Sequence, residues 1–194
     1  MDTPETLDVQ PANTGFSSAR ILLWLGIASI VMLFAGLTSG YIVRQAEGNW
    51  KHFELPVAFT VSTIVILVSS LSMHAALLSA RKNDYQGVRR YLLLTLGLGF
   101  AFVFTQFLGW NSLVSQGVYF VDKSTPSGSF FYVISGLHLA HLAFGLLGLI
   151  VTSMMAMRDR YHAGNVEGLK LCATYWHFLD GLWMYLFVFL AVYR

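Results

Sequence analysis

Long stretches without Asp, Glu, Lys or Arg dominate the pattern of apolar and polar positions along the chain. Five such stretches occur, the last interrupted by a single aspartate: 21–43, 55–80, 91–121, 124–157 and 171–193. Each reaches the roughly 20 residues that cross a hydrocarbon core about 30 Å thick. Apolar residues run continuously within them instead of alternating with polar ones, which favours helices over the strands of a membrane barrel. The pattern therefore predicts an all-α integral membrane bundle of five transmembrane helices.

The boundaries of the five helices follow from the polar residues between them. We expect the spans at about 21–43, 55–80, 91–115, 129–157 and 172–193. The third helix should give way to an interfacial loop within 111–117, where Asn, Ser, Gln and Gly cluster. Residues 1–19 contain acidic but no basic residues, so we expect a disordered cytoplasmic tail and not a secretory signal. Residues 20–194 should form one five-helix transmembrane domain.

Composition agrees with this assignment. Hydrophobic residues make up 56% of the chain and charged residues 11%, whereas about a quarter of the residues of a soluble domain are charged. One cysteine, Cys172, excludes an intrachain disulfide and any cysteine cluster for zinc or iron and sulfur. The net charge of +2 says little about partners, and we expect no nucleic acid among them.

The basic residues are divided unequally between the two ends of the predicted bundle. Eight of the twelve lie on the side of the amino terminus: Arg20, Arg81, Lys82, Arg89, Arg90, Arg158, Arg160 and Lys170. The other four are Arg44, Lys51, Lys123 and Arg194. The positive-inside rule therefore predicts a cytoplasmic amino terminus and a carboxyl terminus outside.

Small residues offer surfaces for close helix packing, because lipid tails give apolar helices no hydrophobic reason to associate. The sequence "GLTSG" places Gly36 and Gly40 four residues apart. Further candidates for close approach are Gly97, Gly99, Gly145, Gly148, Ser69, Ser70 and Ser72.

A few polar side chains stand deep within the predicted spans, namely His74, Gln106, His138, His141, His177 and Asp180. Asp180 is the only formal charge among them, and a carboxylate at mid-membrane costs about 2.5–3.5 kcal/mol on insertion scales. It should therefore face the bundle, a partner or water. In a helix, His177 and Asp180 lie three residues apart and share a face.

Three interpretations of these side chains remain open from the residues alone. Acids and histidines within a membrane fit a proton relay. Histidines from different helices could bind haem from both sides, for which His141 and His177 are the one pair expected at similar depth. Thirdly, the same groups could form a structural network that fixes helices to one another or to a neighbouring subunit.

Two motifs resemble a known family. "SGSFFYVISGLHLAHLAFG" (127–145) and "YWHFLDGLWMYLF" (175–187) resemble the last two helices of subunit III of the haem-copper oxidases. "STIVILVSSLSMHAALLSARKND" and "FVFTQFLGWNSL" resemble the two helices before them. The resemblance covers essentially everything after the tail.

The resemblance implies a noncatalytic subunit of a proton-pumping terminal oxidase in a bacterial plasma (inner) membrane. The complex reduces oxygen to water with electrons from cytochrome c or quinol. Haem and copper belong to subunits I and II, so we expect no cofactor, metal or catalytic residue in this chain. It should bind subunit I directly, join subunit II and other chains in the complex, hold phospholipid and support proton uptake. Residues expected in a buried polar network or in subunit or lipid contacts are His74, Gln106, His138, His141, Trp176, His177, Asp180 and Trp183.

This chain departs from the family pattern in three places. Larger relatives have seven helices and a lipid-filled cleft beside the first two, whereas five are predicted here. Many relatives place a glutamate in the first of the shared helices, where this chain has Ile30. Gly109 and Trp110 stand where relatives often have acidic residues.

Other functions stay open alongside this one. The chain could belong to a quinol oxidase, or it could be the related accessory protein of a nitric oxide reductase. A self-sufficient haem-binding cytochrome or a proton carrier is the alternative from a different class of protein.

Overall fold

Five α-helices make up the fold in the computed structural model, which describes residues 18–48, 50, 53–120, 126–161 and 166–193. They are α1 (Ser18–Ala46), α2 (Val57–Arg81), α3 (Tyr85–Ser115), α4 (Ser127–Met157) and α5 (Glu167–Tyr193). All five are long and apolar enough to cross a membrane, and the described residues contain no strand. The prediction of an all-α bundle with five transmembrane helices is confirmed. Of the predicted tail, residues 1–17 lie outside the described residues, while Ser18 and Ala19 already belong to α1.

Four helices, α1, α3, α4 and α5, begin before their predicted apolar spans, because polar residues extend the helices at their amino-terminal ends. The start of α3 at Tyr85 is fixed by Asp84, whose carboxylate accepts a hydrogen bond from the backbone N–H of Gly87 at 2.9 Å. Asn83 takes a positive φ of 57°, which asparagine tolerates better than most residues. The short connection of residues 82–84 therefore folds α3 back tightly against α2.

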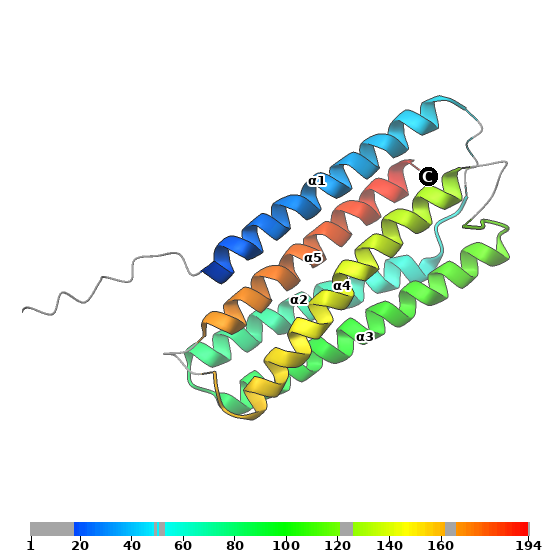
Figure 1. Ribbon diagram of the computed structural model, residues 1–194. Helices are drawn as coiled ribbons and strands as arrows, with labels where there is room; N and C mark the ends of the chain where they lie inside the picture. Colours follow the sequence, from blue (N-terminus) through cyan, green and yellow to red (C-terminus); the bar gives the residue numbers. More distant parts are fainter. Residues whose placement is uncertain (1–17, 49, 51–52, 121–125, 162–165, 194) are drawn as a thin grey trace, which may run out of the picture.

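Four of the helices form a closed ring. Neighbouring pairs in the ring are α2 with α3, α3 with α4, α4 with α5, and α5 with α2. Helix α1 packs only on α4 and α5 among the described helices, and Figure 1 shows it at the edge of the bundle, alongside α5. Because the helices alternate in direction, α1 begins at the end of the bundle opposite to the carboxyl terminus (Figure 1).

The end at which α1 and α5 begin is called the basic end below. It contains Arg20, Arg81, Arg89, Arg158 and Lys170. Here Arg20 of α1 pairs with Glu167 of α5 at 2.6 Å.

Hydrogen bonds also join α1 to α5 at the opposite end. The hydroxyls of Thr38 and Tyr185 lie 3.0 Å apart, and the side chains of Tyr41 and Gln45 donate to the backbone carbonyl of Tyr193 at 3.2 and 3.0 Å. Polar contacts near both ends therefore hold α1, the helix with the smallest buried share.

Close packing depends on only some of the predicted small residues. Gly99 of α3 and Gly145 of α4 both face the ring of Trp176, and a Cβ at Gly99 would come within 2.9 Å of that ring. Gly36 instead faces open space, and so do Gly97 and Gly148. The expectation that Gly36 and Gly40 form a close-approach pair is wrong, because α1 lies at the edge of the bundle, where the nearest side chain to Gly40 is Phe130, at 3.9 Å from an added Cβ.

Candidate functional site

Trp176 of α5 lies at the centre of the ring of four helices and is fully buried. Its indole N–H donates to the hydroxyl of Ser69 on α2 at 3.1 Å, and its ring fits against Gly99 of α3 and Gly145 of α4. The Ser69 hydroxyl in turn donates to the carbonyl of Thr95 on α3 at 3.4 Å. One side chain thus contacts all three other helices of the ring.

Trp183 has the same role two turns further along α5. Its indole N–H donates to the hydroxyl of Thr63 on α2 at 3.0 Å. Its ring packs against Phe102 of α3, with centroids 5.2 Å apart, and against His138 of α4 at 5.1 Å. A buried indole needs a partner for its N–H, and α2 supplies a hydroxyl group at both tryptophans.

His138 lies buried between these aromatic rings, and neither of its ring nitrogens has a hydrogen-bond partner among the described residues. Gln106 is equally buried. Its amide donates to the Ser62 hydroxyl on α2 at 2.9 Å, whereas its carbonyl oxygen lacks a partner there. The centre of the bundle therefore holds separate polar pairs between helices, each enclosed by apolar side chains.

His177 lies on the flank of α5 beside α2. Its Nδ1 lies 2.7 Å from the hydroxyl of Ser70, and its ring is 6.4 Å from that of His74, centroid to centroid. His141 lies elsewhere, with its ring against Phe34 and its Nδ1 2.7 Å from the carbonyl of Leu137. The expectation that His141 is the one histidine at a depth similar to that of His177 is wrong, because the ring of His74 on α2 lies beside that of His177.

Asp180 is 3% exposed, and neither carboxylate oxygen has a hydrogen-bond partner among the described residues. That Asp180 belongs to one polar network with His177 therefore stays a prediction.

Hollows follow α5 along the side that faces α1. Near the basic end, a hollow of about 370 Å³ is lined by Arg20, His74, Arg81, Glu167, Lys170 and His177, with neighbouring apolar residues. A second hollow of about 400 Å³ continues from His177 to Tyr185 along α1 and has an almost entirely apolar lining. His177 lines both, so the polar hollow meets the apolar one at this histidine.

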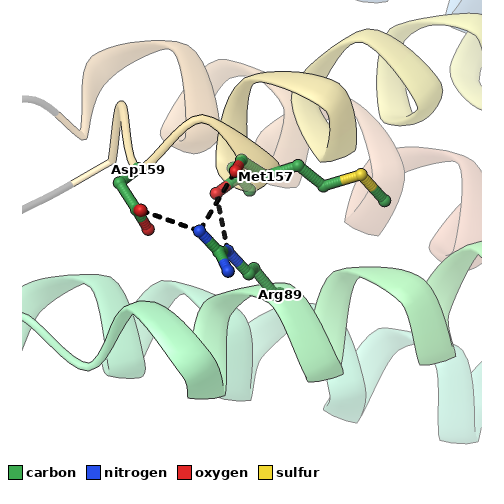
Figure 2. A network of polar contacts seen from close by, with 4 residues as sticks. Arg89, Met157 and Asp159 are labelled. Atoms are coloured by element: carbon green, nitrogen blue, oxygen red, sulfur yellow. Dashed lines mark hydrogen bonds and ion pairs between the residues drawn. The ribbon is translucent and has the colours of Figure 1, made fainter.

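At the basic end, Arg89 of α3 ties down the end of α4. Figure 2 shows its guanidinium group between the backbone of Met157 and the carboxylate of Asp159. It donates to the carbonyls of Ala156 and Met157 at 3.3 and 3.0 Å and to Asp159 at 2.7 Å. A cation at this position complements the unpaired carbonyls at the end of a helix.

Tyr161 follows this connection and packs back onto the bundle, where its hydroxyl donates to the sulfur of Met155 at 3.4 Å. Burial raises the pKa of the Tyr161 hydroxyl above its usual value, so it stays protonated at neutral pH.

Sequence patterns did not identify the partners of the deep polar residues. Thr63 and Ser62 look like ordinary positions of an apolar helix, and Ser69 and Ser70 were expected only as packing surfaces. The sequence feature that could have identified these partners is the spacing of hydroxyl side chains on α2. It matches the spacing of Trp176, His177 and Trp183 on an antiparallel helix. Using it requires knowing that α2 and α5 are neighbours. Within the described part of the chain, no three His, Cys, Asp or Glu side chains are grouped as a metal site would require.

Comparison with known proteins places this arrangement in a family. The sequence model described as cytochrome c oxidase subunit III matches residues 48–194. The cytochrome c oxidase subunit 3 of Corynebacterium diphtheriae is 31% identical over 166 residues, covering 81% of this chain and 80% of that protein. The probable cytochrome c oxidase subunit 3 of Nocardia farcinica is 32% identical, covering 88% and 84%. The cytochrome c oxidase subunit 3 of Bacillus sp. (strain PS3) is 28% identical, covering 95% and 92%.

The match includes α2 to α5 with every buried tryptophan and histidine described above, and the relatives span nearly the same length as this chain. On these grounds the chain belongs to the cytochrome c oxidase subunit III family of the haem-copper oxidases.

Proposed function

We propose that this chain is the noncatalytic third subunit of a haem-copper terminal oxidase in a bacterial plasma membrane. The observation that most strongly supports the proposal is the match of the family over residues 48–194, together with bacterial relatives similar over nearly their whole length. Oxygen reduction to water takes place in partner subunits that hold the haem and copper. This chain supplies no redox centre of its own.

The role of the chain is to support the catalytic subunit mechanically. Trp176 and Trp183 fix the spacing of four helices, which makes the ring a rigid body. Large apolar side chains on the outer faces of α1 and α3, such as Trp24 and Phe104, are exposed. In the membrane such faces contact lipid or another subunit. We infer that one of them binds subunit I, and that subunit II joins through subunit I.

Lipid binding is the second part of the proposal. The hollow beside α5 has three cationic side chains at the basic end, one of them paired with Glu167, and an apolar extension toward Tyr185. A cationic mouth with an apolar continuation suits a phospholipid with its headgroup at the surface. We assign the basic end to the cytoplasmic side on the positive-inside rule.

The electron donor is proposed to be cytochrome c. The relatives are named for cytochrome c oxidase, which supports this donor over quinol and favours an oxidase over a nitric oxide reductase.

Affinity capture tests the proposal. The chain is tagged at its carboxyl terminus, extracted gently from native membranes, and the copurifying chains are identified together with an absorption spectrum. We expect a large haem-bearing membrane subunit and a copper-binding subunit at equal stoichiometry. Membranes with the untagged chain control for nonspecific capture.

Two results would contradict the proposal. If the chain purified alone and contained haem after separation from other proteins, it would be a cytochrome in its own right. If it purified alone and colourless, a carrier or assembly role would replace the proposed one.

A further inference from the structure

Another hollow, called the α4 hollow below, lies at the basic end, where the outer face of α4 meets the turn that follows it. Its volume is about 270 Å³, and its lining consists of Val151, Met154, Met155, Arg158 and Arg160. None of these residues lines the hollows beside α5. Among the described residues, the lining therefore combines two cationic and three apolar side chains with no acidic one.

The backbone turn after α4 brings the two arginines to one place. The N–H groups of Arg158 and Arg160 both donate to the carbonyl of Met155, at 3.1 and 3.3 Å. Asp159 between them has a positive φ of 52°, and its N–H donates to the carbonyl of Ala156 at 3.1 Å. The bonds of Asp159 and Arg160 follow the Schellman pattern of helix ends. A hydrogen-bonded turn therefore sets the positions of both arginines.

Asp159, the one acidic residue between positions 151 and 161, is paired elsewhere. Its carboxylate accepts a hydrogen bond from the guanidinium of Arg89 at 2.7 Å, and Figure 2 shows the two groups turned toward each other. Asp159 is absent from the lining of the α4 hollow. The carboxylate in this turn is thus engaged by α3, and the α4 hollow keeps a positive charge.

An exposed apolar stripe leads along α4 to this hollow. Phe144, Leu147, Val151 and Met154 follow one another at intervals of three or four residues and so share a helix face. Their exposed fractions lie between 46% and 69%. Phe144 and Met154 are ten residues apart, about 15 Å along a helix, which is half of a hydrocarbon core about 30 Å thick. The stripe therefore has the length of one leaflet, with the two arginines at its headgroup end.

We propose that the α4 hollow binds an anionic phospholipid, with its phosphate group between Arg158 and Arg160 and an acyl chain on the apolar stripe. Guanidinium groups bind phosphate oxygens through charge-assisted hydrogen bonds. The stripe is the reason to assign a lipid, because a free phosphate ion would use the arginines alone.

This inference deepens the proposed lipid binding by adding a second site, selective for anionic headgroups. It rests on the proposed function in one respect. Subunit I is placed there on the outer face of α1 or α3, which leaves the outer face of α4 to lipid.

Photocrosslinking of the full chain in phosphatidylcholine nanodiscs tests the site. A graded fraction of the lipid is phosphatidylglycerol with a diazirine on an acyl chain, and mass spectrometry identifies the labelled peptides. We expect labelling within residues 144–157 that reaches half-saturation at a fraction about 25-fold lower than for phosphatidylcholine with the same diazirine, since each arginine near an anionic lipid favours binding by about fivefold. Labelling of α5 reports separately on the hollow beside that helix.

Substitution of the arginines tests their role. Arg158→Gln combined with Arg160→Gln should raise the half-saturating fraction of phosphatidylglycerol by about 25-fold and leave that of phosphatidylcholine unchanged. Arg158→Lys combined with Arg160→Lys keeps the charge and should recover most of the binding, which separates loss of the site from loss of the fold.

Lys82→Gln combined with Arg90→Gln is the matched control. These two residues are exposed at the same end of the bundle, and their substitution removes the same charge, but neither lines the α4 hollow. The half-saturating fraction of phosphatidylglycerol should stay at the wild-type value.

Three outcomes would overturn the proposal. The first is equal labelling of residues 144–157 by the two lipids, and the second is an equal loss of labelling in the matched control. The third is displacement of the labelled lipid by millimolar inorganic phosphate, which would make the hollow a site for free anions. None of these outcomes depends on which subunits copurify, so failure here is distinguishable from failure of the proposed subunit role.

Discussion

At the scale of single residues, the bundle is held by large aromatic side chains that fit against glycines. The ring of Trp176 fits between Gly99 of α3 and Gly145 of α4 while its N–H is bonded to Ser69 of α2. Apolar helices in lipid gain stability from van der Waals contact and hydrogen bonds, and not from expulsion of water. The fit of one indole into two glycine positions is therefore a main source of stability here.

Replacing Gly99 tests this directly. A side chain at Gly99 would meet Leu146 at 2.8 Å and Trp176 at 2.9 Å from its Cβ, so Gly99→Val should destabilise the chain by about 1–3 kcal/mol. Unfolding of the purified chain by SDS, followed by tryptophan fluorescence, measures the change.

Gly97→Val is the matched control. Gly97 lies on nearly the opposite side of the same helix, and nothing lies within 4 Å of a Cβ added there. It should change stability by less than about 0.5 kcal/mol. If the two substitutions destabilised the chain equally, the close contact between Gly99 and Trp176 would not be the reason for the effect.

At the scale of helices, α2 to α5 form a ring and α1 is attached to its edge. The ring is joined by tryptophan side chains inside and by the short α2–α3 connection at the basic end. Among the described helices, α1 packs on α4 and α5 only. At the basic end the ring is completed by Arg89, which joins α3 to the end of α4.

Substitution of Arg89 should loosen the end of α4. Arg89→Met removes the hydrogen bonds to Ala156 and Met157 and the ion pair with Asp159. The ion pair is partly exposed, so we expect a local effect of only about 1 kcal/mol. Hydrogen exchange of peptides covering residues 154–161 should rise by about fivefold at that energy.

Arg90→Met is the control for this experiment, because Arg90 is exposed and removal of its charge leaves those contacts intact. Arg89→Lys should show an intermediate effect, since an ammonium group cannot reproduce the fork of a guanidinium. Unchanged exchange in Arg89→Met would mean that the end of α4 is held by other contacts.

At the scale of the whole molecule, charge is distributed unequally between the two ends while the spans between them are apolar. Five helices place the beginning of α1 at Ser18 and the end of α5 at Tyr193 at opposite ends of the bundle (Figure 1). The basic end also contains the Arg20–Glu167 pair and the polar mouth of the hollow beside α5. The orientation of the molecule in the membrane therefore decides which compartment the mouth of this hollow faces.

Reporter fusions test the orientation. The basic end should be cytoplasmic, because eight of the twelve basic residues lie there and such loops are retained inside. Alkaline phosphatase fused after the carboxyl terminus should be active, and the same enzyme fused within the α2–α3 connection at Asn83 should be inactive. The reverse pattern of activity would place the hollow on the outer side and contradict the assignment.

The sequence by itself determined the class of the fold, the number of helices and the family. These features depend on local properties of the chain. Crossing the hydrocarbon core requires a run of apolar residues of fixed length, and each of the two family motifs, around His138 and around His177, is an uninterrupted stretch of sequence. The end of α3 at Ser115 likewise agrees with the cluster of polar residues that predicted it.

Only the tertiary structure decided which residues meet. Gly36 and Gly40 have the spacing of a packing motif, yet Gly99 and Gly145 form the tight contacts, because close approach depends on which faces two helices present to each other. His177 meets His74 and Ser70 because α5 packs beside α2. The physical reason is that helices apolar on all sides have no amphipathic pattern that fixes their rotation, so the neighbour of each polar side chain emerges only when the bundle is assembled.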